Sequence, residues 1–187
     1  MPQPQRPKIY HITHMTNLPS IIRDGGVSSD AIMRSSGGPR VDVGMANVKQ
    51  ARLTKPVICH PHRTVGEFVP FNFCPRSVML YIFYCNNNPE VAYRGGQGPM
   101  VHLEADLLRV VEWASANGLA WAFCPANARA GYVPFYNDLT DLGRINWSAV
   151  QNDNFRDAAV KEAKQAEFLL VDFFPWEFVA SIGVYSQ

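Results

Sequence analysis

The sequence lacks an excess of charge of either sign, since 17 Lys and Arg face 16 Asp and Glu for a formal net charge of +1. Without a global basic field, any site for a polyanion has to be a local patch. The longest strongly apolar run, residues 78–85, is too short to cross a bilayer, and residues 1–8 lack the apolar stretch of a signal peptide. These absences predict a cytoplasmic protein that does not bind membranes.

Several sequence motifs are also missing. The four cysteines, at positions 59, 74, 85 and 124, include no CxxC pair, which predicts reduced, mostly buried thiols. The segment CHPH at 59–62 has no second pair of ligands at zinc spacing, so we expect no metal. The absence of GxGxxG and GxxxxGK[ST] excludes the usual dinucleotide-binding and P-loop motifs.

The composition is that of a folded domain. With 187 residues, of which 47% are hydrophobic and 18% charged, the chain is long enough for one core that buries about 70% of the surface of the unfolded chain. We expect a single domain over residues 1–187, with residues 1–7 as a flexible tail. Strand and helix patterns do not alternate strictly, which favours a mixed α+β fold over a doubly wound sheet.

The N-terminal half combines a strand, a short helix and a long irregular stretch. Residues 8–12, KIYHI, are typical of a core strand that carries His11. Thr16 or Asn17 can cap a helix that ends at Gly25. Residues 28–45 show no sustained period, which favours a mobile loop over a ligand.

The rest of the chain alternates strands with short helices. Residues 78–85 fit a strand or a helix capped by Ser77, whereas Asp106 and Gly118 mark the two ends of a clear amphipathic helix. Residues 125–160 are rich in turns, with short helices expected after Asp138 and around Trp147. Further strands are predicted at 68–73, 100–105, 119–124, 166–174 and 182–186.

Glu167 is an unusual carboxylate because it begins a segment, EFLLVDFF, whose next four residues are all apolar. A glutamate at the edge of a strand, facing a cleft, would be tuned by partial desolvation to hold a hydroxyl group or exchange a proton. The alternative is a solvated residue at the start of the strand. The spacing alone does not separate the two.

Five segments in chain order resemble the DarT family of DNA ADP-ribosyltransferase toxins: IYHITH at 9–14, ANVKQAR at 46–52, FVPFNFCPRSVMLY at 68–81, YRGGQGP at 93–99 and KQAEFLLVDFFPW at 164–176. The resemblance implies an ADP-ribosyltransferase fold, a split antiparallel β-sandwich core with flanking helices. It also implies the use of NAD⁺ to attach ADP-ribose to a thymidine base in single-stranded DNA, as the toxin of a toxin–antitoxin system.

The resemblance assigns roles to four residues. His11 and Thr13 match the motif that holds the nicotinamide-side ribose and amide of NAD⁺, and Glu167 matches the catalytic glutamate. Arg52 matches the active-site arginine, which would act in catalysis and bind the pyrophosphate or an anionic base. Without the resemblance, the sequence favours a surface arginine at the end of a helix for Arg52.

Residues 125–160 occupy the position of the family's substrate-recognition loop, and we name them the substrate segment. Tyr132, Arg144 and Trp147 are its candidate DNA contacts, because arginines bind phosphates and aromatic rings stack on unpaired bases. The alternative is that Trp147 and Phe135 pack the loop. Members of the family usually continue past the strand at 182–186 with a basic helix and strand, and their loss would weaken DNA contact.

Two other functions are compatible with the same fold. The acceptor of ADP-ribose could be guanosine, RNA or protein, since acceptor choice depends on the substrate segment. An inactive nucleic-acid-binding relative is less consistent with His11, Arg52 and Glu167 being present together. The family resemblance also implies an antitoxin partner with a macrodomain, of the DarG type.

Overall fold

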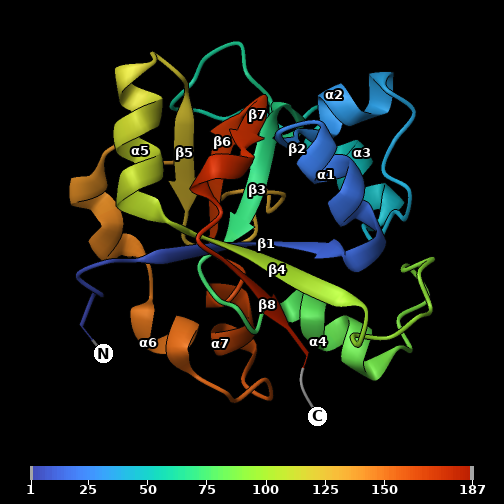
Figure 1. The fold of residues 1–187 in the computed structure, drawn as a ribbon. Helices are drawn as coiled ribbons and strands as arrows, with labels where there is room; N and C mark the ends of the chain where they lie inside the picture. The colour runs from blue at the N-terminus through green and yellow to red at the C-terminus, as the bar shows by residue number, and fades with distance from the viewer. Residues whose placement is uncertain (1, 186–187) are drawn as a thin grey trace.

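The computed structural model describes residues 2–185, and its centre is a six-stranded antiparallel sheet (Figure 1). The strands lie in the order β5 (Trp121–Cys124), β6 (Glu167–Val171), β3 (Phe68–Asn72), β1 (Lys8–His14), β4 (Met100–Asp106) and β8 (Ser181–Val184). A smaller sheet pairs β2 (Gly26–Ser28) with β7 (Phe173–Pro175). The mixed α+β class expected from the sequence is confirmed.

The large sheet is split between β3 and β1. These two strands share a single pair of facing residues, Tyr10 and Asn72, whereas β1 pairs with β4 along its whole length. In Figure 1, β1, β4 and β8 accordingly run across the direction of β3, β5 and β6. The split antiparallel arrangement expected from the resemblance is therefore present, and it leaves Asn72 and its neighbours at the junction of the two halves.

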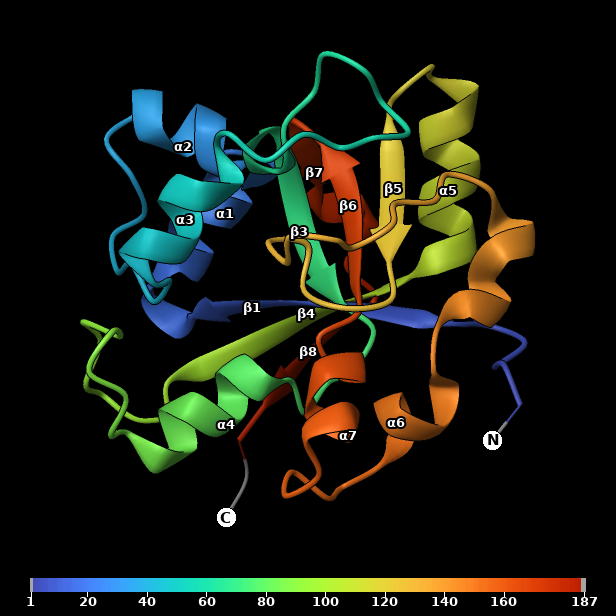
Figure 2. The ribbon, with the colours of Figure 1, turned by 180° about the vertical axis from the view of Figure 1, so that it is seen from behind.

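Helices cover the edges and both ends of this sheet (Figures 1 and 2). A group of three short helices lies beside the end of β1: α1 (Leu18–Arg23), α2 (Asp30–Ser35) and α3 (Ala46–Arg52). Below β1 and β4 in both views lie α4 (Val78–Cys85), α6 (Trp147–Gln151) and α7 (Ala158–Ala163), and α5 (Leu107–Ala116) flanks β5. Four 3₁₀ turns complete the described elements: Met15–Asn17, Val65–Glu67, Leu139–Arg144 and Trp176–Phe178.

Local signals place the ends of several helices. The Asp106 carboxylate accepts hydrogen bonds from the backbone N–H groups of Leu108 and Arg109, and Gly118 has a positive φ of 65° just after α5. The Ser77 hydroxyl accepts from Leu80 N–H, so residues 78–85 form the capped helix rather than the alternative strand. The Ser77 cap therefore accounts for the helix at residues 78–85, where the spacing of apolar residues alone allowed either a helix or a strand.

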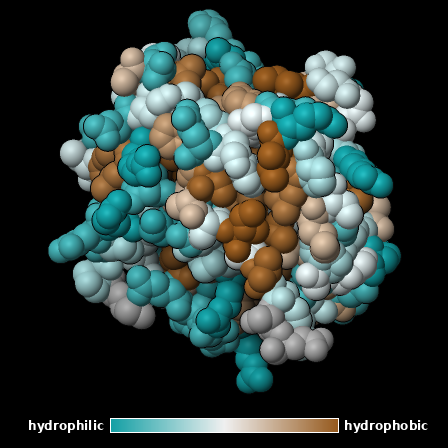
Figure 3. Space-filling view, in the orientation of Figure 1, coloured by the Kyte–Doolittle hydropathy of each residue, from teal (hydrophilic) through white to brown (hydrophobic). Residues whose placement is uncertain are grey.

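Strand β6 is buried on both faces, which explains its continuous apolar sequence. Phe168 and Leu170 join the main core, whose closest aromatic contact is Phe71 against Phe174 at 4.7 Å between ring centroids. Leu169 and Val171 face a second apolar cluster. Strand β8 at the edge is exposed, and the lower part of the apolar strip down the middle of the face in Figure 3 lies over it.

Two expectations about mobile segments are wrong in part. Residues 28–45 contain the end of β2 and helix α2, whose first turn is capped by the Ser29 hydroxyl, so only residues 36–45 are irregular. In the expected N-terminal tail, Arg6 pairs with Asp106 at 2.9 Å and the Pro7 carbonyl accepts from Leu107 N–H. The Ser29 cap is a local contact, whereas the partners of Arg6 and Pro7 lie 100 residues further along the chain, where the local sequence does not reveal them.

Within residues 2–185 all four cysteines are free thiols, with Cys74 and Cys124 buried and Cys59 and Cys85 partly exposed. Every helix described in that range is too short or too polar to cross a bilayer.

Candidate active site

A large cavity lies between β1, helices α1 to α3 and residues 36–45. Its volume is about 810 Å³, within the range of sites for small-molecule ligands and cofactors. Side chains from widely separated positions meet in its wall, among them His11, Thr13, Asn17, Lys49 and Arg52. We refer to this cavity as the cleft.

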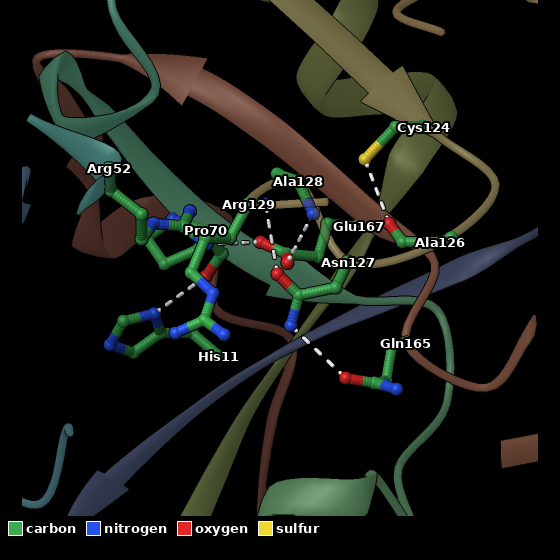
Figure 4. A network of polar contacts seen from close by, with 10 residues as sticks. All are labelled: His11, Arg52, Pro70, Cys124, Ala126, Asn127, Ala128, Arg129, Gln165 and Glu167. Carbon is green, nitrogen blue, oxygen red and sulfur yellow. Dashed lines mark hydrogen bonds and ion pairs between the residues drawn. The ribbon is translucent and has the colours of Figure 1, made fainter. Parts of the chain in front are cut away.

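Glu167 begins β6, where its neighbours across the sheet are Asn72 and Cys124. Only 6% of Glu167 is exposed, so the solvated alternative is wrong. Its Oε2 accepts a hydrogen bond of 2.8 Å from Arg52 Nη1, and its Oε1 accepts one of 3.0 Å from the backbone N–H of Ala128 (Figure 4). Both carboxylate oxygens are therefore held.

Arg52 is the last residue of α3, and it is buried, with 6% of its surface exposed. Burial lowers the pKa of Arg52, but the carboxylate of Glu167 outweighs that effect and the pKa is raised overall. Its Nε and Nη2 atoms are buried and have no hydrogen-bond partner among the described residues. Because such donors cost about 1–3 kcal/mol each when unpaired, they are suited to a bound anion or carbonyl group.

His11 faces the cleft from β1, and its Nδ1 lies 2.9 Å from the carbonyl oxygen of Pro70. A carbonyl can only accept, so Nδ1–H is the donor in this bond. Burial lowers the pKa of His11, which keeps the ring neutral at pH 7. The lone pair on Nε2 is then available to accept a hydrogen bond from a ligand hydroxyl.

Thr13 is connected to the irregular residues 36–45 through Asn17. The Asn17 side-chain amide donates to Thr13 Oγ1 at 3.2 Å and to the Val41 carbonyl at 2.9 Å, and its oxygen accepts from Val41 N–H at 2.9 Å. Lys49 adds an ion pair with Asp42 at 2.8 Å. The sequence indicated Asn17 only as a helix cap, a role its side chain does not have, and no local signal revealed its partner 24 residues away.

Comparison with known proteins decides the family. A family model described as "ssDNA thymidine ADP-ribosyltransferase, DarT" matches residues 10–187. The chain belongs to the DarT family. This membership confirms the resemblance and the fold expected from the sequence.

Relatives and solved structures of DarT proteins agree with the family model. The chain is 37% identical to a DNA ADP-ribosyl transferase of Thermus aquaticus, over 96% of this chain and 75% of the relative. A second DNA ADP-ribosyl transferase, from a Thermus species, is 34% identical over 98% of this chain and 84% of its own. The structure of Thermus sp. 2.9 DarT in complex with ADP-ribosylated ssDNA superimposes with a TM-score of 0.87 at 32% identity, covering 100% of this chain and 85% of that one. The same DarT in complex with NAD⁺ gives a TM-score of 0.78.

The three candidate DNA contacts of the substrate segment, residues 125–160, differ in how far they are exposed. Tyr132 is fully exposed, and Arg144 is exposed beside Asp141 at 3.6 Å. Trp147 is only 6% exposed, packs edge-on against Phe73, and donates its indole N–H to the Leu142 carbonyl. Trp147 is therefore a packing residue in this structure, because almost all of its surface is buried.

Metal-ligating side chains do not gather in the described part of this DarT protein. Among residues 2–185, no group of three or more His, Cys, Asp and Glu could hold a metal ion. In the CHPH segment, His60 Nε2 lies 2.8 Å from the Trp121 carbonyl oxygen, so this ring ties a turn to β5.

His102 in β4 makes the stability of this DarT protein sensitive to acid. Burial lowers the pKa of His102 to about 4, and its Nδ1 is buried without a partner among the described residues. Protonation therefore favours the unfolded chain, and the stability present above pH 6.5 is lost as the pH falls towards 4, by about 3 kcal/mol. We expect His102→Asn to remove most of this loss, as measured by urea unfolding at pH 7 and pH 4.5. An equal loss in the variant and the parent would contradict this expectation.

Proposed function

We propose that the cleft binds NAD⁺ and that Glu167, Arg52, His11 and Thr13 carry out ADP-ribosyl transfer to thymidine in single-stranded DNA. The observation that carries the proposal is the buried Glu167–Arg52 pair, in which Arg52 also lines the cleft and has two guanidinium nitrogens without a partner among the described residues. The family description and the relatives' complexes with NAD⁺ and with ADP-ribosylated ssDNA support the same reaction.

The residues of the cleft fit NAD⁺ as the co-substrate. The neutral His11 ring offers its Nε2 lone pair to a ribose hydroxyl. Because Thr13 Oγ1 already accepts from Asn17, its own O–H is free to donate to the nicotinamide amide. Arg52 Nε and Nη2 supply a planar fork for the pyrophosphate or for an anionic base.

Glu167 has the central role in the proposed chemistry. When bound, NAD⁺ supplies an ADP-ribosyl group whose bond to nicotinamide breaks while positive charge develops on the ribose. The Glu167 carboxylate stabilises that charge and holds the ribose hydroxyls. It also accepts the proton that leaves the thymine ring nitrogen as the new bond forms. The Arg52 guanidinium holds the carboxylate in place.

The fit of His11 to NAD⁺ can be measured directly. We expect His11→Ala to weaken NAD⁺ binding by about 1–3 kcal/mol, that is roughly 5- to 150-fold in Kd, because one buried hydrogen bond is lost. His14→Ala is the matched control, since His14 is in the same strand but contacts Thr16 and Tyr93 instead of the cleft. Calorimetric titration with NAD⁺ gives both values, and an unchanged Kd for His11→Ala would rule out this role.

Oligonucleotide mass tests the reaction itself. After incubation with NAD⁺, a single strand containing thymidine should gain the mass of one ADP-ribosyl group. The duplex should react about ten- to a hundredfold more slowly, because its thymine nitrogen is paired and flipping the base costs a few kcal/mol. Labelling that survives replacement of every thymidine would identify guanosine or another acceptor. RNA and protein acceptors would show as mass gained by those molecules.

Tyr132 and Arg144 are the proposed DNA contacts of the substrate segment, since both are exposed on it. Tyr132→Ala and Arg144→Ala test these contacts, because each should weaken DNA binding and leave NAD⁺ binding unchanged.

We further propose a macrodomain antitoxin of the DarG type as the partner that controls the toxin. Because NAD⁺ and DNA are both cytoplasmic in the bacteria from which the relatives come, the proposed site of action is the cytoplasm.

A further inference from the structure

The turn that follows β5, residues 124–130, is held by its own polar groups (Figure 4). Burial raises the pKa of the Cys124 thiol, so it stays protonated, and its Sγ–H donates to the Ala126 carbonyl at 3.1 Å. The Asn127 side-chain oxygen accepts from Arg129 N–H at 2.9 Å, and the Asn127 carbonyl accepts from Ala130 N–H at 2.9 Å. The backbone direction between Asn127 and Arg129 is thereby fixed.

Asn127 also joins this turn to the segment that leads into β6. Its side-chain N–H donates to Gln165 Oε1 at 3.1 Å, and Gln165 Nε2 donates to the Lys161 carbonyl of α7 at 3.2 Å. Gln165 stands two residues before Glu167 in the chain. A single pair of amide side chains therefore ties together the two segments on either side of the catalytic carboxylate.

The bridge between Asn127 and Gln165 also affects the next backbone N–H of the turn, that of Ala128. Ala128 N–H, adjacent to Asn127, donates to Glu167 Oε1, and Ala128 is completely buried. Arg52 holds Oε2 from the other side. Rotation of the carboxylate breaks both bonds as long as the turn keeps its place, whereas a loose turn leaves only the bond to Arg52.

We propose that Asn127 is a positioning residue for Glu167, acting through the Ala128 N–H and anchored by Gln165. This inference rests on the proposed role of Glu167 in ADP-ribosyl transfer. Asn127 orients the catalytic carboxylate, and precise orientation by supporting hydrogen bonds is what a preorganised site requires. The contribution belongs to the rate of transfer and leaves NAD⁺ affinity unaffected.

Asn127→Ala tests the proposal. We expect the single-turnover rate of transfer to fall about ten- to a hundredfold, the size of effect that small misplacements of catalytic groups produce. The NAD⁺ Kd should stay within about twofold, because His11, Thr13 and Arg52 are untouched. Asn137→Ala is the matched control, since Asn137 is an exposed asparagine of the same substrate segment, and it should behave like the parent.

Asn127→Asp separates the turn from the bridge. Aspartate keeps the oxygen that accepts from Arg129 N–H but has no N–H to donate to Gln165 Oε1. A Gln165 amide turned by 180° would donate to the second oxygen only by giving up the bond from its Nε2 to the Lys161 carbonyl. We therefore expect Asn127→Asp to be about as slow as Asn127→Ala, and a parent rate in Asn127→Asp would mean that the bridge to Gln165 is not what matters.

Gln165→Ala keeps the test decisive if Asn127→Ala fails to fold, since it breaks the same bridge from the other side. The double variant should lose no more rate than the larger of the two single losses. Parent rates in both single variants, additive losses, or a rate loss matched by an equal loss of NAD⁺ affinity would overturn the proposal. If the parent itself transfers nothing to DNA, the proposed acceptor is wrong, and hydrolysis of NAD⁺ to nicotinamide and ADP-ribose then carries the same comparison of variants.

Discussion

Glu167→Gln is expected to lower the single-turnover rate of transfer about a thousandfold, because it removes the negative charge that the proposed mechanism places against the developing positive charge. Glutamine has nearly the size of glutamate and keeps one of the two hydrogen bonds to Ala128 and Arg52, so the protein should remain folded. NAD⁺ binding should change far less than the rate. Rapid quench with a labelled oligonucleotide and calorimetry with NAD⁺ measure the two quantities separately.

The choice of glutamine follows from the burial of Arg52. Both Glu167→Ala and Glu167→Gln remove the counter-charge of a buried guanidinium, but alanine also removes the oxygen that can accept a hydrogen bond from it. Breaking a buried ion pair from one side costs about 3–5 kcal/mol, and the hydrogen bond that glutamine keeps makes it the less destabilised of the two variants. Glu162→Gln is the matched control, since Glu162 is an exposed carboxylate of α7. Transfer by Glu167→Gln within tenfold of the parent would refute the catalytic role.

The sequence predicted most elements because their signals are local. The caps of α4 and α5, from Ser77 and Asp106, lie within three residues of the N–H groups that they bind. The wholly apolar segment after Glu167 predicted a buried strand, and β6 is one. Signals of this range survive in the sequence because chain neighbours supply both partners.

The site depends on partners that are far apart in the chain. Arg52 and Glu167 are separated by 115 residues, and only the family resemblance brought them together, since helix position alone left Arg52 as a surface residue. Asn17 was missed because its partner Val41 lies in an irregular stretch. In the substrate segment, Trp147 and Tyr132 are both aromatic candidates but have opposite exposure, because Trp147 packs against Phe73 and bonds to the Leu142 carbonyl.

The buried pair of Arg52 and Glu167 predicts opposite results for single and double replacements. Arg52→Met leaves the Glu167 carboxylate buried with only the Ala128 N–H, and Glu167→Leu leaves the guanidinium buried with no partner among the described residues. Each single variant should lose about 3–5 kcal/mol of unfolding free energy, a large part of the 5–15 kcal/mol typical of a domain. Urea unfolding measures these losses.

Combining Arg52→Met with Glu167→Leu should restore the unfolding free energy to about that of the parent, because the gain from removing two buried charges offsets the cost of the buried Ala128 N–H that loses its acceptor. Apolar side chains of similar volume then replace two desolvated charges, and such exchanges are neutral or stabilising by about 1–4 kcal/mol. Transfer and NAD⁺ hydrolysis should nevertheless be absent from all three variants, because neither charge can be recovered from an apolar residue. The site would then be shown to hold its ion pair for chemistry and not for stability. A double variant destabilised by the sum of the two single losses would contradict this, since additive losses mean that the two residues contribute independently.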